Sequence, residues 1–522
     1  MHNACLNRVR NAVIAATVCA VSACASVGPG GLPQLAEPRG RGDDHPPSLQ
    51  LLNRLTWGAS PASARQAAAI GGDRFIEQQL LPAAAALPRE IQAQIDAMTI
   101  SRRSLEDLVR GIEQRRKETN AIADANEKKT AQQADQQEMN QIAREPAARA
   151  LLRALYSSNQ LHEQMTWFWM NHFNVSQSKS NIRLLLGDYE ERAIRAHALG
   201  RFRNLLSAAA HHPAMLRYLD NEQNAAGRIN ENFARELMEL HTLGVNGGYT
   251  QNDVQELARI LTGLGVNLTG TAPNVRPQLQ SQYVRDGLFE FNPNRHDYGD
   301  KIFLGQPVKA RGLAEAGEAI DRLARHPATA NFISRKLAVY FVADDPPPAL
   351  VERMARTFQG TDGDIAATLR TLFYSPEFRH SLGRKFKDPL HYVVSAVRLA
   401  YDDKLILNTA PMLGWLSRMG QPLYGRATPD GYPMTQAAWA SPGQMAVRFE
   451  IAKAIGQGSA GLFKSDGPQP VERAAFPQLA NALYYGTLQK ELSAGTLQAL
   501  EQANSPQEWN MYLLASPEFM NR

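Results

Sequence analysis

Cysteine is nearly absent from this chain of 522 residues, which contains only Cys5, Cys19 and Cys24. All three lie within the first 24 positions, so the rest of the chain has no thiol that forms a disulfide or binds a metal. A domain of several hundred residues folds without such links, because it buries most of its surface. Stability must therefore come from packing and hydrogen bonds.

Long apolar runs are also absent, with one short exception near the amino terminus. Residues 12–21 are mainly apolar, follow Arg8 and Arg10, and precede small residues. This order is typical of a secretory signal, and the run is shorter than the roughly 20 residues that cross a bilayer as a helix. We therefore expect export, with a body that is soluble.

The signal ends in Val-Ser-Ala-Cys at residues 21–24, which resembles the lipobox of bacterial lipoproteins. The resemblance implies cleavage after residue 23 and lipidation of Cys24. The alternative is an ordinary signal peptide cut near Ala23, which leaves Cys24 as a free thiol. Ala25 favours the outer membrane over inner-membrane retention. We expect an outer-membrane lipoprotein that faces the periplasm or the exterior, with a signal peptide at 1–23 and a Gly- and Pro-rich flexible tether at 24–47.

Several function classes lack their signatures. The net charge is only +5, and no basic run is interleaved with aromatic residues, which argues against nucleic-acid binding. The chain has no G-x-S-x-G elbow of serine hydrolases, no H-E-x-x-H zinc motif and no phosphate-binding P-loop. The sequence therefore names no reaction.

Helical periodicity is what dominates the chain. Residues 48–522 are predicted to form one multi-helix, all-α domain with one small β-hairpin, made by strands at 288–291 and 301–304 around Asn292-Pro293-Asn294. The predicted helices cover 183–199, 202–210, 231–243, 251–261, 312–324, 329–341, 349–358, 364–373 and 389–401.

A polar helical excursion interrupts this pattern at about 102–145. Few large apolar residues follow Glu113, so the segment is predicted to be a long solvated helix or a partly disordered insertion. The alternative is a lid or a partner-binding arm. Pro146 is expected to start a new helix.

The helix predicted at 231–243 divides into two faces. Apolar residues, together with His241, fall on one side, and Glu236 and Glu239 fall on the other. The two carboxylates either converge on a metal or substrate proton, or pair with Arg235 and Arg259 along the surface. Thr250 and Asp253 have the spacing of a capping box at the start of the next helix.

Six segments resemble a bacterial family of proteins of unknown function, numbered 1800. They are NENFARELMELHTLGVNGGYTQNDV at 230–254, WMNHF at 169–173, HPAMLRYLDN at 212–221, RHDYGDK at 295–301, KFKDP at 385–389 and GQPLY at 420–424. The resemblance implies an exported, mostly helical protein without an established activity. It also implies an association with a sulfatase-like exported family numbered 1501.

Candidate site residues are scattered along the chain. His172, Glu236, His296 and Asp297 are candidate catalytic residues, and a possible divalent metal is the only cofactor considered. Candidate ligand-binding residues are Glu239 and three aromatic residues that would line a groove or, alternatively, pin a loop to the helices: Tyr424, Tyr432 and Trp439.

Two functions remain open. The first is a binding or accessory protein that acts with another exported protein. The second is a hydrolase or lyase that acts on an envelope or extracellular polymer through a His/carboxylate cluster. Convergence of His172, Glu236 and His296 in one pocket would favour the enzyme, and their dispersal would favour the accessory protein.

Overall fold

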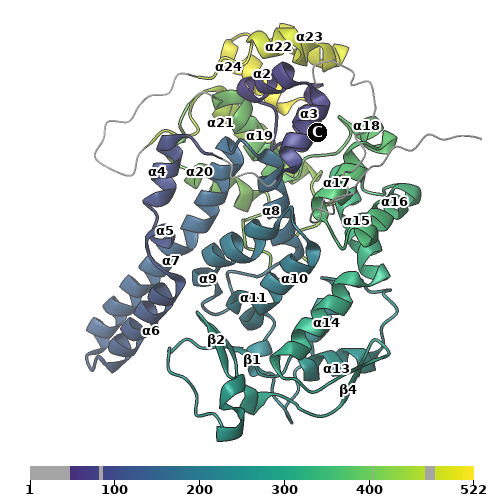
Figure 1. Cartoon of the computed structure of the whole chain (residues 1–522). Helices are drawn as coiled ribbons and strands as arrows, with labels where there is room; N and C mark the ends of the chain where they lie inside the picture. Colours follow the sequence, from purple (N-terminus) through teal and green to yellow (C-terminus); the bar gives the residue numbers. More distant parts are fainter. Residues whose placement is uncertain (1–47, 82–85, 403, 465–475) are drawn as a thin grey trace, which may run out of the picture. The chain divides into compact units, whose positions relative to one another are not determined.

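Helices make up most of the computed structural model, as the sequence predicted, and the structure describes residues 48–81, 86–402, 404–464 and 476–522 (Figure 1). The predicted lipidation site Cys24, the predicted signal peptide at 1–23 and the predicted tether at 24–47 all lie outside the described residues. No helix in the described ranges combines the length and the apolar character that crossing a membrane requires.

The helices of the first half are α1 Leu49–Leu55, α2 Pro61–Ile70, α3 Gly72–Leu80, α4 Arg89–Asp96, α5 Thr99–Arg102, α6 Leu105–Ala121, α7 Ala125–Tyr156, α8 Gln160–His172, α9 Ile182–Asp188, the π-helix η1 Tyr189–Ile194, the 3₁₀ turn η2 Arg195–His197, α10 Phe202–His211, α11 Pro213–Tyr218, η3 Asn221–Gln223, α12 Asn232–Glu239 and α13 Gln251–Ile260. The second half contains η4 Pro277–Gln282, η5 Pro293–Arg295, α14 Leu313–Arg325, α15 Pro327–Phe341, α16 Pro348–Gly360, α17 Ile365–Phe373, α18 Pro376–Ser381, α19 Pro389–Tyr401, α20 Ala410–Arg418, η6 Gln436–Ala438, α21 Pro442–Gly456, α22 Ala482–Gly486, η7 Leu488–Glu491, α23 Ala494–Glu501 and α24 Pro506–Ala515.

The central helix α8 is buried on nearly all sides. Leu161, Met165 and Phe168 are buried along one face, and Trp169 is buried beside them. A helix that is covered all round belongs to the core of a large domain. The carboxyl end of α8 therefore places His172 deep inside the protein.

The predicted strands exist, but the predicted hairpin between them is wrong. β3 Phe289–Phe291 lies between β1 Leu264–Val266 and β2 Val284–Asp286 in an antiparallel sheet. β4 Lys301–Phe303 pairs instead with β5 Gln306–Val308. Leu304 and Gly305 have φ values of 50° and 72°, which suit the tight turn of a two-residue hairpin.

The polar segment forms a pair of antiparallel helices, α6 and the first part of α7, which extends away from the other helices in Figure 1. Between Glu113 and Gln141, Thr119 is the one residue of these helices that is buried. Polar contacts hold the pair together, including Arg115 to Glu138 at 2.9 Å. We call residues 113–141 the polar arm.

Pro146 does not start a new helix, so that prediction is wrong. It lies inside α7, which continues to Tyr156. A proline within a helix removes one backbone hydrogen bond. Its ring is buried in a region where α7 packs on α9, close to Gly187, and this packing offsets the loss.

Removing the tip of the polar arm should leave the fold intact. Deletion of residues 117–137 with a short Gly/Ser bridge is expected to shift the melting temperature by only a few degrees, since it removes little buried surface. Arg115 and Glu138 are in contact, so a short bridge suffices. Calorimetry checks this, and loss of the cooperative transition would contradict it.

Candidate functional site

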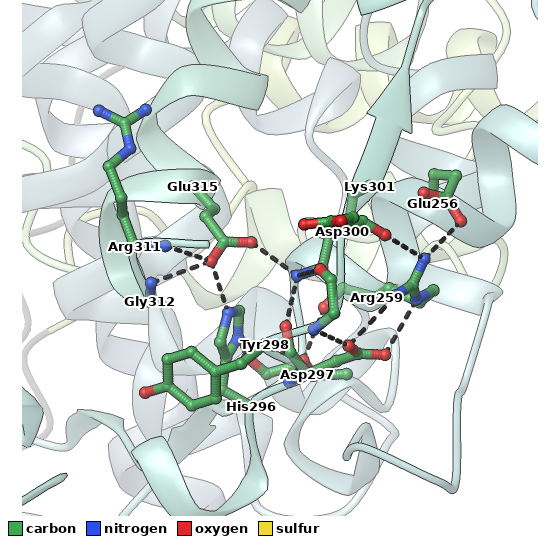
Figure 2. A network of polar contacts seen from close by, with 12 residues as sticks. Glu256, Arg259, His296, Asp297, Tyr298, Asp300, Lys301, Arg311, Gly312 and Glu315 are labelled. Carbon is green, nitrogen blue, oxygen red and sulfur yellow. Dashed lines mark hydrogen bonds and ion pairs between the residues drawn. The ribbon is translucent and has the colours of Figure 1, made fainter. Parts of the chain in front are cut away.

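His296 and Asp297 lie in a closed polar network, which we call the His296–Glu315 network (Figure 2). Glu315, in the first turn of α14, accepts from His296 Nε2 at 3.0 Å and from Lys301 Nζ at 2.8 Å. It also accepts from the backbone N–H groups of Arg311 and Gly312. The side chains of His296, Lys301 and Glu315 have no exposed surface.

The electrostatics of this network favour an ionised Glu315. Burial by itself would raise the pKa of this carboxyl group, but the hydrogen bonds from His296 and Lys301 outweigh burial and lower the pKa to about 2. His296 Nδ1 donates to the carbonyl of Thr262 at 2.8 Å. Both ring nitrogens of His296 are thus engaged within the protein.

Asp297 is paired on the outer side of the same network. Arg259 donates to it from Nε at 2.9 Å and from a terminal nitrogen at 3.2 Å. Arg259 also contacts Glu256 at 2.8 Å. Arg259 is therefore committed to Asp297 and Glu256, and the expectation that it pairs with the carboxylates of α12 is not met.

A second group of polar residues gathers where several of the family-like segments meet. We call it the motif junction and define it by His172, Glu236, Glu239, His241, Lys336 and Asp430. His172 and His241 form a reciprocal pair: His172 Nε2 lies 3.0 Å from the His241 carbonyl, and His241 Nδ1 lies 2.9 Å from the His172 carbonyl. Because carbonyls only accept, these two nitrogens carry protons.

Burial and the nearby Lys336 favour the neutral form of both rings, although the reciprocal hydrogen bonds oppose this in part. Burial lowers the pKa of His172 well below its ordinary value and lowers that of His241 to about 3, with Lys336 as a further cause for each. The free nitrogen of His172, Nδ1, lies 2.9 Å from Nζ of Lys336. His241 Nε2 is buried and has no hydrogen-bond partner among the described residues.

Glu236 and Glu239, on the helix α12 that precedes His241, are partly buried. Within the described residues, neither carboxylate forms an ion pair. Glu239 interacts with the Tyr249 hydroxyl, and Arg235 pairs instead with Glu231 at 3.0 Å. Burial, and then the charges of Glu239 and Asp430, raise the pKa of Glu236, although Arg235 lowers it in part. Neither predicted alternative is therefore met in full: the two carboxylates are not paired with Arg235 and Arg259, and they are not part of a metal-binding cluster among the described residues.

A loop formed by residues 424–434 closes over the carboxyl end of α8. The side-chain amide of Asn171 donates to the Tyr432 carbonyl at 2.9 Å and accepts from the Tyr432 N–H at 2.6 Å. These hydrogen bonds hold the loop that carries Asp430, whose charge acts on both Lys336 and Glu236.

The three aromatic candidates of this region are buried. Tyr424 donates to Glu190, Tyr432 donates to the Pro422 carbonyl at 2.7 Å, and Trp439 donates to the Pro433 carbonyl at 2.8 Å. The Tyr432 ring packs between Trp167 and Trp439, with centroid distances of 6.5 and 6.2 Å. The structure favours the interpretation in which these aromatics pin the loop.

The predicted site residues thus fall into separate groups. His172 and Glu236 belong to the motif junction, whereas His296 and Asp297 belong to the His296–Glu315 network. Among the residues that the structure describes, no three His, Cys, Asp or Glu side chains are placed to share a metal ion. Lys336 and Asp430 were missed, because a lysine on an amphipathic helix and an aspartate in a loop look solvent-exposed in a sequence.

No curated protein and no solved structure matches this chain. The sequence model of one family, described as protein of unknown function (DUF1800), matches residues 50–521. This match covers nearly the whole chain and includes the motif junction, the His296–Glu315 network and the polar arm, so the chain belongs to the DUF1800 family.

Proposed function

We propose that the mature protein is an outer-membrane lipoprotein that acts as a binding or accessory protein with another exported protein. The observation that carries this proposal is the dispersal of the candidate catalytic residues. His296 and Asp297 are held by Glu315 and Arg259, away from the histidine pair of the motif junction. Side chains whose hydrogen bonds and ion pairs are already made within the protein are poor acids, bases or ligands for a substrate.

The polar arm is the surface that we assign to a partner. It adds exposed polar surface and little buried apolar surface, so stability of the fold does not account for it. A sulfatase-like protein of the family numbered 1501 is the partner that the sequence resemblance suggests. We include this sulfatase-like protein, as the partner, in the proposal.

A pull-down tests the partner. The mature lipoprotein is used to capture proteins from an envelope extract, and the variant lacking residues 117–137 is the matched control. We expect a specific exported protein with the intact arm and its loss with the deletion. Equal capture by both proteins would remove the arm from the proposal, and no specific capture by either would contradict the accessory function.

The alternative is a hydrolase or lyase that acts on an envelope or extracellular polymer. The observation that favours it is the pair of partly buried carboxylates, Glu236 and Glu239, which form no ion pair with an arginine in the described part of the chain. The captured sample is therefore also analysed for bound metal and for cleavage of envelope polymers. Cleavage by the isolated protein would favour this alternative.

Anchoring gives a separate prediction. Cys24→Ser removes the sulfur that the lipid would modify, so we expect the variant in the soluble periplasmic fraction, without incorporation of a fatty-acid probe. Membrane fractionation and probe labelling measure this. Cys19→Ser, within the predicted signal, is the control and should remain in the membrane. Membrane association of both variants would contradict the lipoprotein assignment.

A further inference from the structure

Lys336 differs from three ion-paired lysines, Lys179, Lys301 and Lys385, in what its amino group contacts. It extends from α15 to the carboxyl end of α8, where Nζ lies 2.9 Å from His172 Nδ1. The ring of Phe332, one turn earlier on α15, lies 5.5 Å from Nζ. Within the described residues, no carboxylate forms an ion pair with Lys336.

Ion-paired lysines in the same protein provide the contrast. Lys301 contacts Glu315 at 2.8 Å and two backbone carbonyls. Lys385 contacts Asp344 and the Met434 carbonyl, and Lys179 contacts Asp220 at 2.8 Å. A carboxylate at this distance stabilises the charged ammonium, which is not a nucleophile. Lys336 instead contacts the neutral imidazole of His172, where the other three lysines contact a carboxylate.

The charged and titratable groups around Lys336 come from three elements. His172 ends α8, His241 follows α12, and both rings are neutral. Asp430, from the loop at 424–434, is the one carboxylate whose charge favours the ammonium. Burial outweighs it and lowers the pKa of Lys336 to about 8. Lys336 as a residue is only partly buried, so small reagents approach it from solvent.

We propose that Lys336 is a nucleophilic amine that captures small carbonyl compounds, aldehydes above all, as an imine. The ammonium first releases a proton to solvent. The neutral nitrogen then attacks the carbonyl carbon, and the carbonyl oxygen leaves as water when the C=N bond forms. His172 Nδ1 orients the amine through its hydrogen bond.

Reductive methylation tests the proposal. The mature protein is treated with formaldehyde and cyanoborohydride, which reduces each imine by hydride transfer, and peptide mass spectrometry gives an initial rate for every lysine between pH 6 and 10. At pH 7.5 about a quarter of an amine with a pKa of about 8 is neutral, against about one in a thousand for an ordinary lysine. We expect Lys336 to react at least ten-fold faster than exposed Lys117 and Lys490.

Two variants make the result decisive. Asp430→Asn removes the nearby negative charge, so the pH midpoint of the Lys336 rate should fall, while the rates of Lys117 and Lys490 should not change. Lys336→Arg should abolish the fast-reacting site without unfolding the protein. A Lys336 rate equal to or below that of Lys117 at pH 7.5 would overturn the proposal, and so would a midpoint that Asp430→Asn leaves unchanged.

Discussion

Replacing Glu315 with Gln is expected to lower the free energy of unfolding by roughly 3 to 5 kcal/mol, the range found when one partner of a buried ion pair is removed. Glu315 is fully buried and joins Lys301, His296 and two backbone N–H groups. An amide cannot neutralise Lys301, and its NH₂ group would face a donor. Urea unfolding of both proteins measures the loss.

Glu318→Gln is the matched control, since it makes the same substitution one turn later on the same helix. Glu318 pairs with Arg311 and Arg322, but its side chain remains partly exposed. Such surface pairs typically contribute only about 0 to 1 kcal/mol. If Glu315→Gln lowered the free energy of unfolding no more than Glu318→Gln does, the His296–Glu315 network would not stabilise the fold as its geometry indicates.

The same carboxylate has a defined effect on acid stability. Its pKa is lowered from the ordinary 4.5 to about 2 in the folded protein, so the folded state favours the ionised form. The stabilisation is therefore complete above pH 4.5 and is lost as the pH falls from 4.5 toward 2, with a magnitude of roughly 3 kcal/mol. Glu315→Gln should remove this part of the acid dependence, which unfolding measured across that pH range will show.

The sequence predicted helices well where periodicity and end signals agreed. The predicted helix at 389–401 matches α19, and that at 202–210 ends one residue before α10 does. Thr250 and Asp253 form the expected capping box at 3.2 and 2.8 Å. Local sequence encodes these features, because a helix end satisfies its own backbone groups.

Features that depend on distant partners were not predictable. The expected hairpin failed because β3 finds partners on both edges, and β4 turns back on β5 at Leu304 and Gly305. Pro146 continues a helix because burial against the core offsets its missing N–H. The pairing of β3 with β1 and the continuous helix at Pro146 are decided by tertiary packing, which overrides local preference, whereas β4 and β5 form a local hairpin.

The candidate site shows the same division. The helix predicted at 231–243 ends earlier, at Glu239, but the wheel correctly predicted that His241 is buried and that Glu236 lies on the more exposed side. It did not reveal that His241 pairs with His172, which lies 69 residues earlier, or that Lys336 completes the group. Histidine chemistry depends on the partner of each ring nitrogen, and a sequence does not specify those partners.

Gly431 links the loop at 424–434 to the motif junction, and its replacement by Ala should be severe. Its φ is +76°, and a Cβ atom added there would lie 2.1 Å from the backbone oxygen of Asn171. The left-handed conformation costs a non-glycine residue roughly 1–2 kcal/mol, and forcing an atom into a packed contact typically costs a further 1–3 kcal/mol. We therefore expect a loss of about 3 kcal/mol, or a loop that detaches from α8.

Gly420→Ala separates the two costs. Gly420 has a similar φ of +79°, but an added Cβ would meet no atom within 4 Å, so only the conformational cost of roughly 1–2 kcal/mol should appear. The difference between the two variants in urea unfolding measures the contact with Asn171. If the loop detaches, Asp430 moves away from Lys336, and the pH midpoint for methylation of Lys336 should fall in Gly431→Ala alone. Equal stability losses in both variants would show that Asn171 does not hold this loop, and Asp430 would then need another anchor.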